Sequence, residues 1–109
     1  MAREKFHTLT EQMFYILLCL RQERCGVDVM EAVRQLTDGR VVIGPGTLYT
    51  LLEDFLQQEW ISEGTPDGRK RRYRLTERGE RRLQEEAERL RLLYADYCSV
   101  VEKREEESP

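Results

Sequence analysis

Side chains that commonly carry out catalysis or bind metals are scarce in this chain. Its 109 residues include one histidine, His7, and three cysteines, Cys19, Cys25 and Cys98, without a Cys-x-x-Cys spacing. There is no Ser/His/Asp or Cys/His combination and no phosphate-binding loop, and the paired carboxylates are adjacent residues, which point in different directions on a helix. We therefore predict that the protein is not an enzyme and holds no metal, no other cofactor and no disulfide.

Long apolar segments are absent as well. No apolar run approaches the roughly 18 residues that a transmembrane helix needs, and the start of the chain, Met1 to Lys5, lacks the apolar region of a signal peptide. Charged residues make up 36% of the chain and hydrophobic residues 39%, which is typical of a single, highly solvated helical domain. We expect a cytoplasmic protein without membrane contact.

The chain has no excess of positive charge, yet its basic residues are concentrated. The formal net charge is −3. Residues 69–82 hold eight Lys and Arg against Glu77 and Glu80, a local net charge of +6, whereas the segments on both sides are net acidic. Because salt screens charges over roughly 8–10 Å, a phosphate responds to this local patch more than to the whole chain. The patch favours a nucleic-acid partner despite the negative total.

Three helices are predicted before the basic patch. Apolar residues at helical spacing mark them over about 10–23, 28–37 and 44–59. Thr10 can cap the first helix. Asp38-Gly39 ends the second, because glycine suits the left-handed position just past a helix C-terminus.

A hairpin and a long helix follow. Short strands over 60–64 and 71–75 flank a turn, and Thr76 can cap the last helix. The fold class is therefore mainly α with a small β-hairpin, in the element order of a winged helix-turn-helix. The predicted division is an N-terminal arm at 1–8, a winged helix-turn-helix DNA-binding domain at 9–76, a C-terminal dimerisation helix at 77–104 and an acidic, disordered tail at 105–109.

The start of the third helix, Gly44 to Leu52, is the most informative segment. Pro45 presets the dihedral of the first turn, and the two glycines let another backbone approach closely. No Arg, Asn or Gln stands in these first turns, so specificity would rest on methyl contacts, half-site spacing and DNA shape. With the wing, residues 65–72, this segment supplies the candidate DNA-binding residues Arg40, Gly46, Thr47, Tyr49, Thr50, Arg69, Lys70, Arg71 and Arg72.

The last helix carries an apolar stripe that its own small domain cannot cover along its whole length. The stripe is spaced 4, 3, 4, 3 and 4 residues apart, the period of a coiled-coil seam. We expect it to form a homodimer together with the first helix; the alternative is that it folds back on the first helix of its own chain. The candidate interface residues are Met13, Leu17, Leu83, Ala87, Leu90, Tyr94, Tyr97 and Val101.

Aromatic residues near this seam are candidates for an effector pocket. Phe14, Tyr15, Tyr94 and Tyr97 could stack on a small aromatic effector. The alternative, that these rings only fill the interface, stays open.

Three motifs resemble those of the PadR family of bacterial transcriptional regulators. They are the segment Gly44 to Leu52, the pair Arg69-Lys70, and the stretch from Tyr73 to Gly79, within a similarity that covers about residues 9–98. The resemblance implies a winged helix-turn-helix homodimer whose first and last helices form the interface. It also implies repression of nearby genes, relieved in some members by an aromatic acid, a drug or another small molecule. The single C-terminal helix resembles the smaller subfamily.

The chain departs from the family pattern at several positions. Gly44 and Thr50 stand where the family usually has serine and proline, and Glu59 stands where it usually has glycine. Glu53 and Asp54 occupy positions that are often basic, and they would repel phosphate if they faced a duplex. We therefore expect affinity for DNA to depend mainly on the wing.

Two functions from different classes remain. The first is a sequence-specific DNA-binding regulator, a homodimer on double-stranded DNA with a pseudo-palindromic operator whose half-sites lie about 34–36 Å apart. The alternative is a winged-helix protein-interaction module that binds no DNA, which Glu53, Asp54 and the overall acidity favour. Two of the candidate DNA contacts also have alternatives: Tyr49 could be a partly buried packing residue, and the wing could be a solvated loop without a DNA contact.

Overall fold

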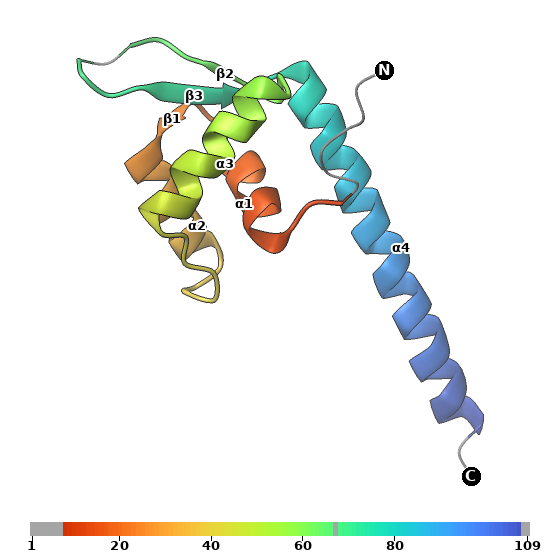
Figure 1. Ribbon diagram of the computed structural model, residues 1–109. Coiled ribbons are helices and arrows are strands. Elements are labelled where there is room, and N and C mark those ends of the chain that lie inside the picture. Colours follow the sequence, from red (N-terminus) through yellow and green to blue (C-terminus); the bar gives the residue numbers. More distant parts are fainter. Residues whose placement is uncertain (1–7, 67, 108–109) are drawn as a thin grey trace.

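The computed structural model describes residues 8–66 and 68–107, with side chains described as far as Glu102. Most of the predicted N-terminal arm, including His7, and also Asp67 of the turn and the last two tail residues lie outside the described residues. The predicted fold class, mainly helical with a small sheet, is confirmed (Figure 1). The elements are α1 (Glu11–Cys19), β1 (Arg24–Cys25), α2 (Gly26–Leu36), α3 (Pro45–Gln57), β2 (Ile61–Glu63), β3 (Arg72–Leu75) and α4 (Glu77–Glu107).

The sheet has three antiparallel strands in the order β1-β3-β2. The predicted hairpin is present as β2 and β3, with Ile61 opposite Leu75. Strand β1 joins the other edge of β3, with Arg24 opposite Tyr73. The sequence prediction missed β1 because two residues are too short to show the alternation that marks a strand.

The core lies between α1, α2 and α3 and extends to the sheet (Figure 1). Met13 and Leu17, predicted for the dimer interface, are 1% and 0% exposed and belong to this core, as does Leu83 at 4%. Their own chain therefore covers these three side chains. Helical spacing marks an apolar face without indicating which surface covers it. The largest fully buried side chains include Trp60, Phe55, Met13, Ile16, Leu17, Leu20, Leu48 and Leu52.

Helix α1 begins as predicted and ends early. The Thr10 cap is confirmed, since the Met13 N–H donates to Thr10 Oγ1 over 3.2 Å. The helix ends at Cys19 rather than near Glu23. Arg24 Nε donates to the Cys19 carbonyl over 2.9 Å, so a side chain from β1 takes up a carbonyl that a longer helix would use.

Two residues beyond the ends of α2 and α3 the backbone is left-handed, at Asp38 with φ 52° and at Glu59 with φ 62°. After α3, the Trp60 N–H donates to the Phe55 carbonyl over 3.0 Å and the Glu59 N–H to the Leu56 carbonyl over 3.1 Å, the two bonds of a Schellman motif. The rings of Phe55 and Trp60 lie 5.7 Å apart, which supplies the apolar contact that commonly accompanies this motif.

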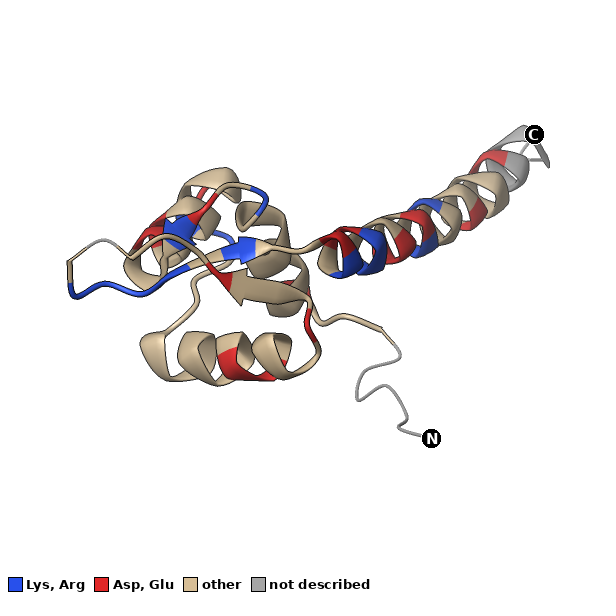
Figure 2. Cartoon of the chain, turned by 90° about the horizontal axis from the view of Figure 1, so that it is seen from above, with Lys and Arg blue, Asp and Glu red and all other residues tan. Residues whose placement is uncertain are grey.

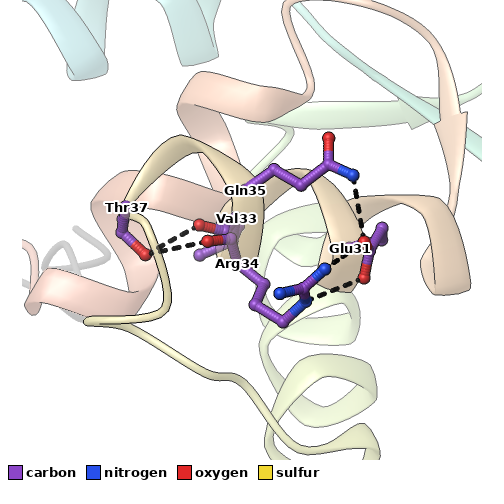
Figure 3. Close-up of polar contacts among 5 residues, drawn as sticks. All are labelled: Glu31, Val33, Arg34, Gln35 and Thr37. Atoms are coloured by element: carbon purple, nitrogen blue, oxygen red, sulfur yellow. Dashed lines mark hydrogen bonds and ion pairs between the residues drawn. The ribbon is translucent and has the colours of Figure 1, made fainter.

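A buried hydroxyl fixes the exit from α2. Thr37, 1% exposed, donates from Oγ1 to the Val33 carbonyl over 2.9 Å (Figure 3). The same oxygen accepts the Val41 N–H over 3.0 Å. On the exposed side of the same helix, Arg34 pairs with Glu31 over 2.6 Å (Figure 3). The hydroxyl therefore sets the path of the connector that leads into α3.

Helix α4 starts against the corner that follows α3 and then leaves the body of the domain (Figure 1). The predicted cap is confirmed, since the Gly79 N–H donates to Thr76 Oγ1 over 3.0 Å, and this hydroxyl also donates to the Glu59 carbonyl over 2.7 Å. The helix continues to Glu107, so the predicted tail boundary at residue 105 is too early. With α4 projecting, the molecule measures 65 × 39 × 21 Å.

Candidate nucleic-acid interface

The first turn of α3 is exposed and carries no side-chain cap. Gly44 is the N-cap residue and Pro45 follows at the first helical position, as expected. Residues 44–47 are all exposed, whereas Leu48 is 0% and Leu52 is 1% exposed. The later turns therefore hold the helix in the core while its first N–H groups and positive dipole end face solvent, an arrangement suited to an anion.

Tyr49 lies on the edge between α3 and α2. It is 47% exposed, and a Cβ built on Gly26 would lie 2.6 Å from Tyr49 Oη. The Tyr49 ring therefore packs against the start of α2, and it can do so because Gly26 has no side chain there. Thr47 and Thr50 are exposed on the same helix, and Arg40 is exposed in the connector before it.

The wing and Tyr49 share one hollow, which we call the wing hollow. Its volume is about 330 Å³. Beside the start of α2, it brings together four of the predicted DNA-binding residues, one from α3 and three from the wing. The lining residues are Cys25, Gly26, Val27, Tyr49, Arg69, Lys70, Arg71 and Tyr73.

The four basic residues of the wing divide into two kinds. Arg69 and Lys70 are exposed, and neither contacts an acidic side chain among the described residues. Arg71 and Arg72 both pair with carboxylates of their own chain. Figure 2 shows the Lys and Arg of the wing at the end of the molecule that lies away from α4.

Arg72 has a structural role that the sequence did not indicate. Its Nε lies 3.0 Å from Glu23 Oε2, and its Nη2 donates to the Glu23 carbonyl over 3.1 Å. Both side chains are about a quarter exposed, at 26% and 28%. This pair ties β3 to the segment between α1 and β1, so Arg72 is less accessible to DNA than the rest of the wing.

Glu53 of α3 acts electrostatically on two groups that line the wing hollow. Burial raises the pKa of Tyr73, Arg71 lowers it, and Glu63, Tyr49 and Glu53 raise it further. The hydrogen bond to Glu63 raises the pKa of Arg71, and Glu53 acts in the same direction. An acidic residue of α3 therefore stands within electrostatic reach of the wing hollow.

The outer part of α4 carries an exposed apolar face, which we call the α4 stripe. Its residues are 40% to 69% exposed, and the rings of Tyr94 and Tyr97 stack with centroids 6.2 Å apart. The sequence prediction included three of its members and missed Leu93 and Val100, which the 3.6-residue period of a straight helix places on the same side. The stripe consists of Leu90, Leu93, Tyr94, Tyr97 and Val100.

Of the remaining predicted interface residues, Ala87 is exposed and Val101 is half-buried. The predicted effector residues do not all lie together. Phe14 and Tyr15, in edge-to-face contact at 5.7 Å, line a hollow of about 380 Å³ between α1 and α4. Tyr94 and Tyr97 lie farther along α4 and do not line it.

A buried carboxylate borders this second hollow. Glu86 is 2% exposed, accepts the Leu9 N–H over 3.3 Å and pairs with Arg89. The hydrogen bond from Arg89 is the main reason that the pKa of Glu86 lies below its ordinary value. The contact joins the segment before α1 to α4 and so fixes how α4 leaves the domain.

Three further properties concern metal binding, membrane spanning and the cysteines in residues 8–66 and 68–107. No three His, Cys, Asp or Glu side chains in this part of the chain lie together as a metal site requires. No helix in it has the length and apolar character to span a membrane. The cysteines are free thiols, buried at Cys19 and Cys25 and half-buried at Cys98.

Known proteins are similar to this chain in sequence and in fold. A family model, the transcriptional regulator PadR-like family, matches residues 16–85. Transcriptional regulator YqjI of Escherichia coli (strain K12) is 29% identical over 92 residues, which are 84% of this chain and 44% of YqjI. The chain thus spans less than half the length of this relative.

Solved structures agree with the fold. A PadR family transcriptional regulator from Eggerthella lenta DSM 2243 has a TM-score of 0.63 at 24% identity, over 89% of this chain and 83% of that one. A transcriptional regulator from Clostridium thermocellum has a TM-score of 0.66 at 21% identity, over 85% of this chain and 90% of that one. With a family model that matches well over half of its residues, the chain belongs to the PadR-like family of transcriptional regulators.

Proposed function

We propose that this protein is a cytoplasmic, non-enzymatic regulator that binds double-stranded DNA as a homodimer and represses a nearby gene. One observation carries the proposal of DNA binding: the uncapped first turn of α3 is exposed, and Tyr49 of the same helix shares a hollow with the basic wing. A groove-reading helix and a phosphate-binding loop need this proximity.

The first turn of α3 would enter the major groove. The N–H groups at Gly46 and Thr47, with the helix dipole, would meet a backbone phosphate, while Tyr49 and Thr50 would reach phosphates or base edges. Arg40, exposed in the connector before α3, would bind the backbone beside it. Because these residues are poor base readers, the operator would be recognised largely by its shape and half-site spacing.

The wing would supply most of the attraction to DNA. Arg69 and Lys70 are exposed and unpaired among the described residues, so binding a phosphate costs them no internal contact. Arg71 would join them after exchanging its own partner, and Arg72 would contribute mainly by its charge.

The salt dependence of DNA binding tests this assignment. Each phosphate contact adds about 0.9 to the slope of log affinity against log salt, so Arg69→Ala and Lys70→Ala should each flatten it by about that amount. Arg34→Ala removes an exposed guanidinium from α2 and is the matched control. Unchanged slopes in both wing variants would refute the wing contacts. No salt-sensitive complex at all would favour the protein-interaction module.

A second copy of the chain would cover the α4 stripe. Five large apolar side chains, each at least 40% exposed, follow one side of a helix that extends beyond its own domain. Such a contiguous exposed patch commonly marks a protein interface. Two copies joined there would place two α3 helices on a pseudo-palindromic operator, with half-sites about 34–36 Å apart.

The dimer is tested by one substitution on each side of α4. Leu93→Glu puts a charge into the stripe, at a residue that is 53% exposed. Leu92→Glu puts the same charge at a residue that is 50% exposed and lies on the opposite side of the helix. Light scattering should give a monomer for the first variant and a dimer for the second, and a monomeric wild-type protein at micromolar concentration would contradict the proposal.

A small aromatic effector would bind beside the dimer seam. Phe14 and Tyr15 line the hollow between α1 and α4. Tyr94 and Tyr97 do not line it, so they would contact the effector only if the α4 of a second copy brought them to the hollow. Binding there would change the angle between α4 and the domain, and with it the spacing of the two α3 helices.

A further inference from the structure

Arg71 pairs with one carboxylate at the edge of the wing hollow and lies within the electrostatic reach of a second. Its Nε is 2.7 Å from Glu63 Oε1 on β2, and Glu53 of α3 adds to the negative potential that it feels. Its guanidinium also lies 5.5 Å from the centre of the Tyr73 ring. Glu63 is opposite Tyr73 in the β2–β3 register, so the sheet itself sets the carboxylate beside Arg71.

This pair differs from the neighbouring pair, which Arg72 makes at the start of β3. The side chains of Arg71 and Glu63 are 56% and 55% exposed, whereas those of Arg72 and Glu23 are 26% and 28% exposed. Arg72 makes a second bond to the Glu23 carbonyl, so it is held in the body of the domain. The Arg71–Glu63 pair is single and open to solvent, and exposed pairs of this kind exchange partners at little cost.

We propose that Glu63 occupies Arg71 in place of a DNA phosphate in the free protein, and that this competition sets the affinity of the wing for DNA. The inference rests on the proposed DNA-binding function and adds to it an acidic residue that determines affinity. The Tyr73 ring holds the guanidinium in the same place whether its partner is Glu63 or a phosphate.

The competition has a thermodynamic signature. When Arg71 leaves Glu63 for a phosphate, the freed carboxylate takes up a cation, which offsets the cation released from the DNA. In Glu63→Gln, Arg71 has no carboxylate partner before binding. No carboxylate is then freed to take up a cation, so the release of cations from the DNA is no longer offset. The salt dependence of binding should therefore become steeper by up to about 0.9 in log–log slope, and the affinity at low salt should rise by up to about fivefold.

The test measures fluorescence anisotropy of a labelled mixed-sequence duplex over a series of NaCl concentrations, with the full chain. Glu63→Gln should bind more tightly and with a steeper slope than the wild type. Glu31→Gln is the matched control, because it breaks an equally exposed pair with Arg34 (Figure 3) and changes the charge by the same amount. It should leave the slope unchanged.

A double variant separates competition from simple repulsion between Glu63 and DNA. If Glu63 acts through Arg71, the gain from Glu63→Gln disappears when Arg71→Ala is also present. A gain that persists in that background would overturn the proposal, as would a Glu63→Gln variant that binds like the wild type. If the wild type itself binds no duplex in a salt-dependent way, the proposed function fails and the inference falls with it.

Discussion

Replacing Glu59 by glycine should stabilise the protein. Glu59 has φ 62° in the Schellman motif that ends α3, a backbone conformation that favours glycine. A left-handed conformation costs a residue with a Cβ roughly 1–2 kcal/mol, and glycine gives back about 0.5–1 kcal/mol through its extra freedom in the unfolded chain. We therefore expect Glu59→Gly to raise the free energy of unfolding by about 0.5–1 kcal/mol.

The loss of the side chain itself should matter little. Glu59 is exposed, and among the described residues its carboxylate makes no hydrogen bond or ion pair. Its carbonyl accepts the Thr76 hydroxyl, and glycine retains that carbonyl. Backbone conformation is therefore the main term that the substitution changes.

Urea denaturation at a fixed protein concentration measures the effect, with an unchanged dependence on urea as the sign that the transition is otherwise the same. Glu59→Ala is the control, since it removes the carboxylate but keeps the Cβ, and it should give no gain. Asp38→Gly, at the left-handed end of α2, should gain less because aspartate tolerates this conformation better. A glycine variant no more stable than the alanine variant would refute the reasoning.

Three other predictions concern buried contacts. Thr37→Val removes the hydroxyl that serves the Val33 carbonyl and the Val41 N–H, and it should cost about 1–3 kcal/mol in urea denaturation, whereas Thr37→Ser should cost less. Glu86 has a lowered pKa in the folded state, so its carboxylate contributes stability above the unfolded value of 4.5, and that contribution is lost as the pH falls through the folded value. Urea midpoints measured from neutral to acidic pH should therefore fall more steeply for the wild type than for Glu86→Gln, and parallel curves would contradict this. Gly79→Ala would bring a Cβ to 2.0 Å from the Trp60 carbonyl oxygen, so it should destabilise the fold by about 3 kcal/mol or more, visible as a loss of the cooperative transition.

Local signals in the sequence predicted the elements well. Thr10 and Thr76 cap their helices as expected, and Pro45 opens α3. These signals act over a few residues, so one sequence is enough to identify them. The same holds for the concentrated basic charge of the wing and for the exposed first turn of α3, both of which could be read from neighbouring residues.

Contacts between distant segments could not be predicted in this way. The early end of α1 depends on Arg24, and the pairing of Arg72 with Glu23 joins residues that are 49 positions apart. Met13 was predicted for the dimer interface but is buried in the core of its own chain. An apolar face gives no sign of whether its own chain or a partner covers it. The sequence therefore predicted which residues make up the candidate site. It did not predict which of the charged residues pair with carboxylates of their own chain.

In the proposed function, two copies of this chain bind one DNA duplex through α3 and the wing. The most direct test is the mass, by light scattering, of the protein mixed with a duplex taken from the DNA upstream of its own gene, at low and at high salt. We predict two chains per duplex at low salt and dissociation of the complex as the salt concentration rises. A protein that stays unbound at low salt, or that binds as one chain, would contradict the account.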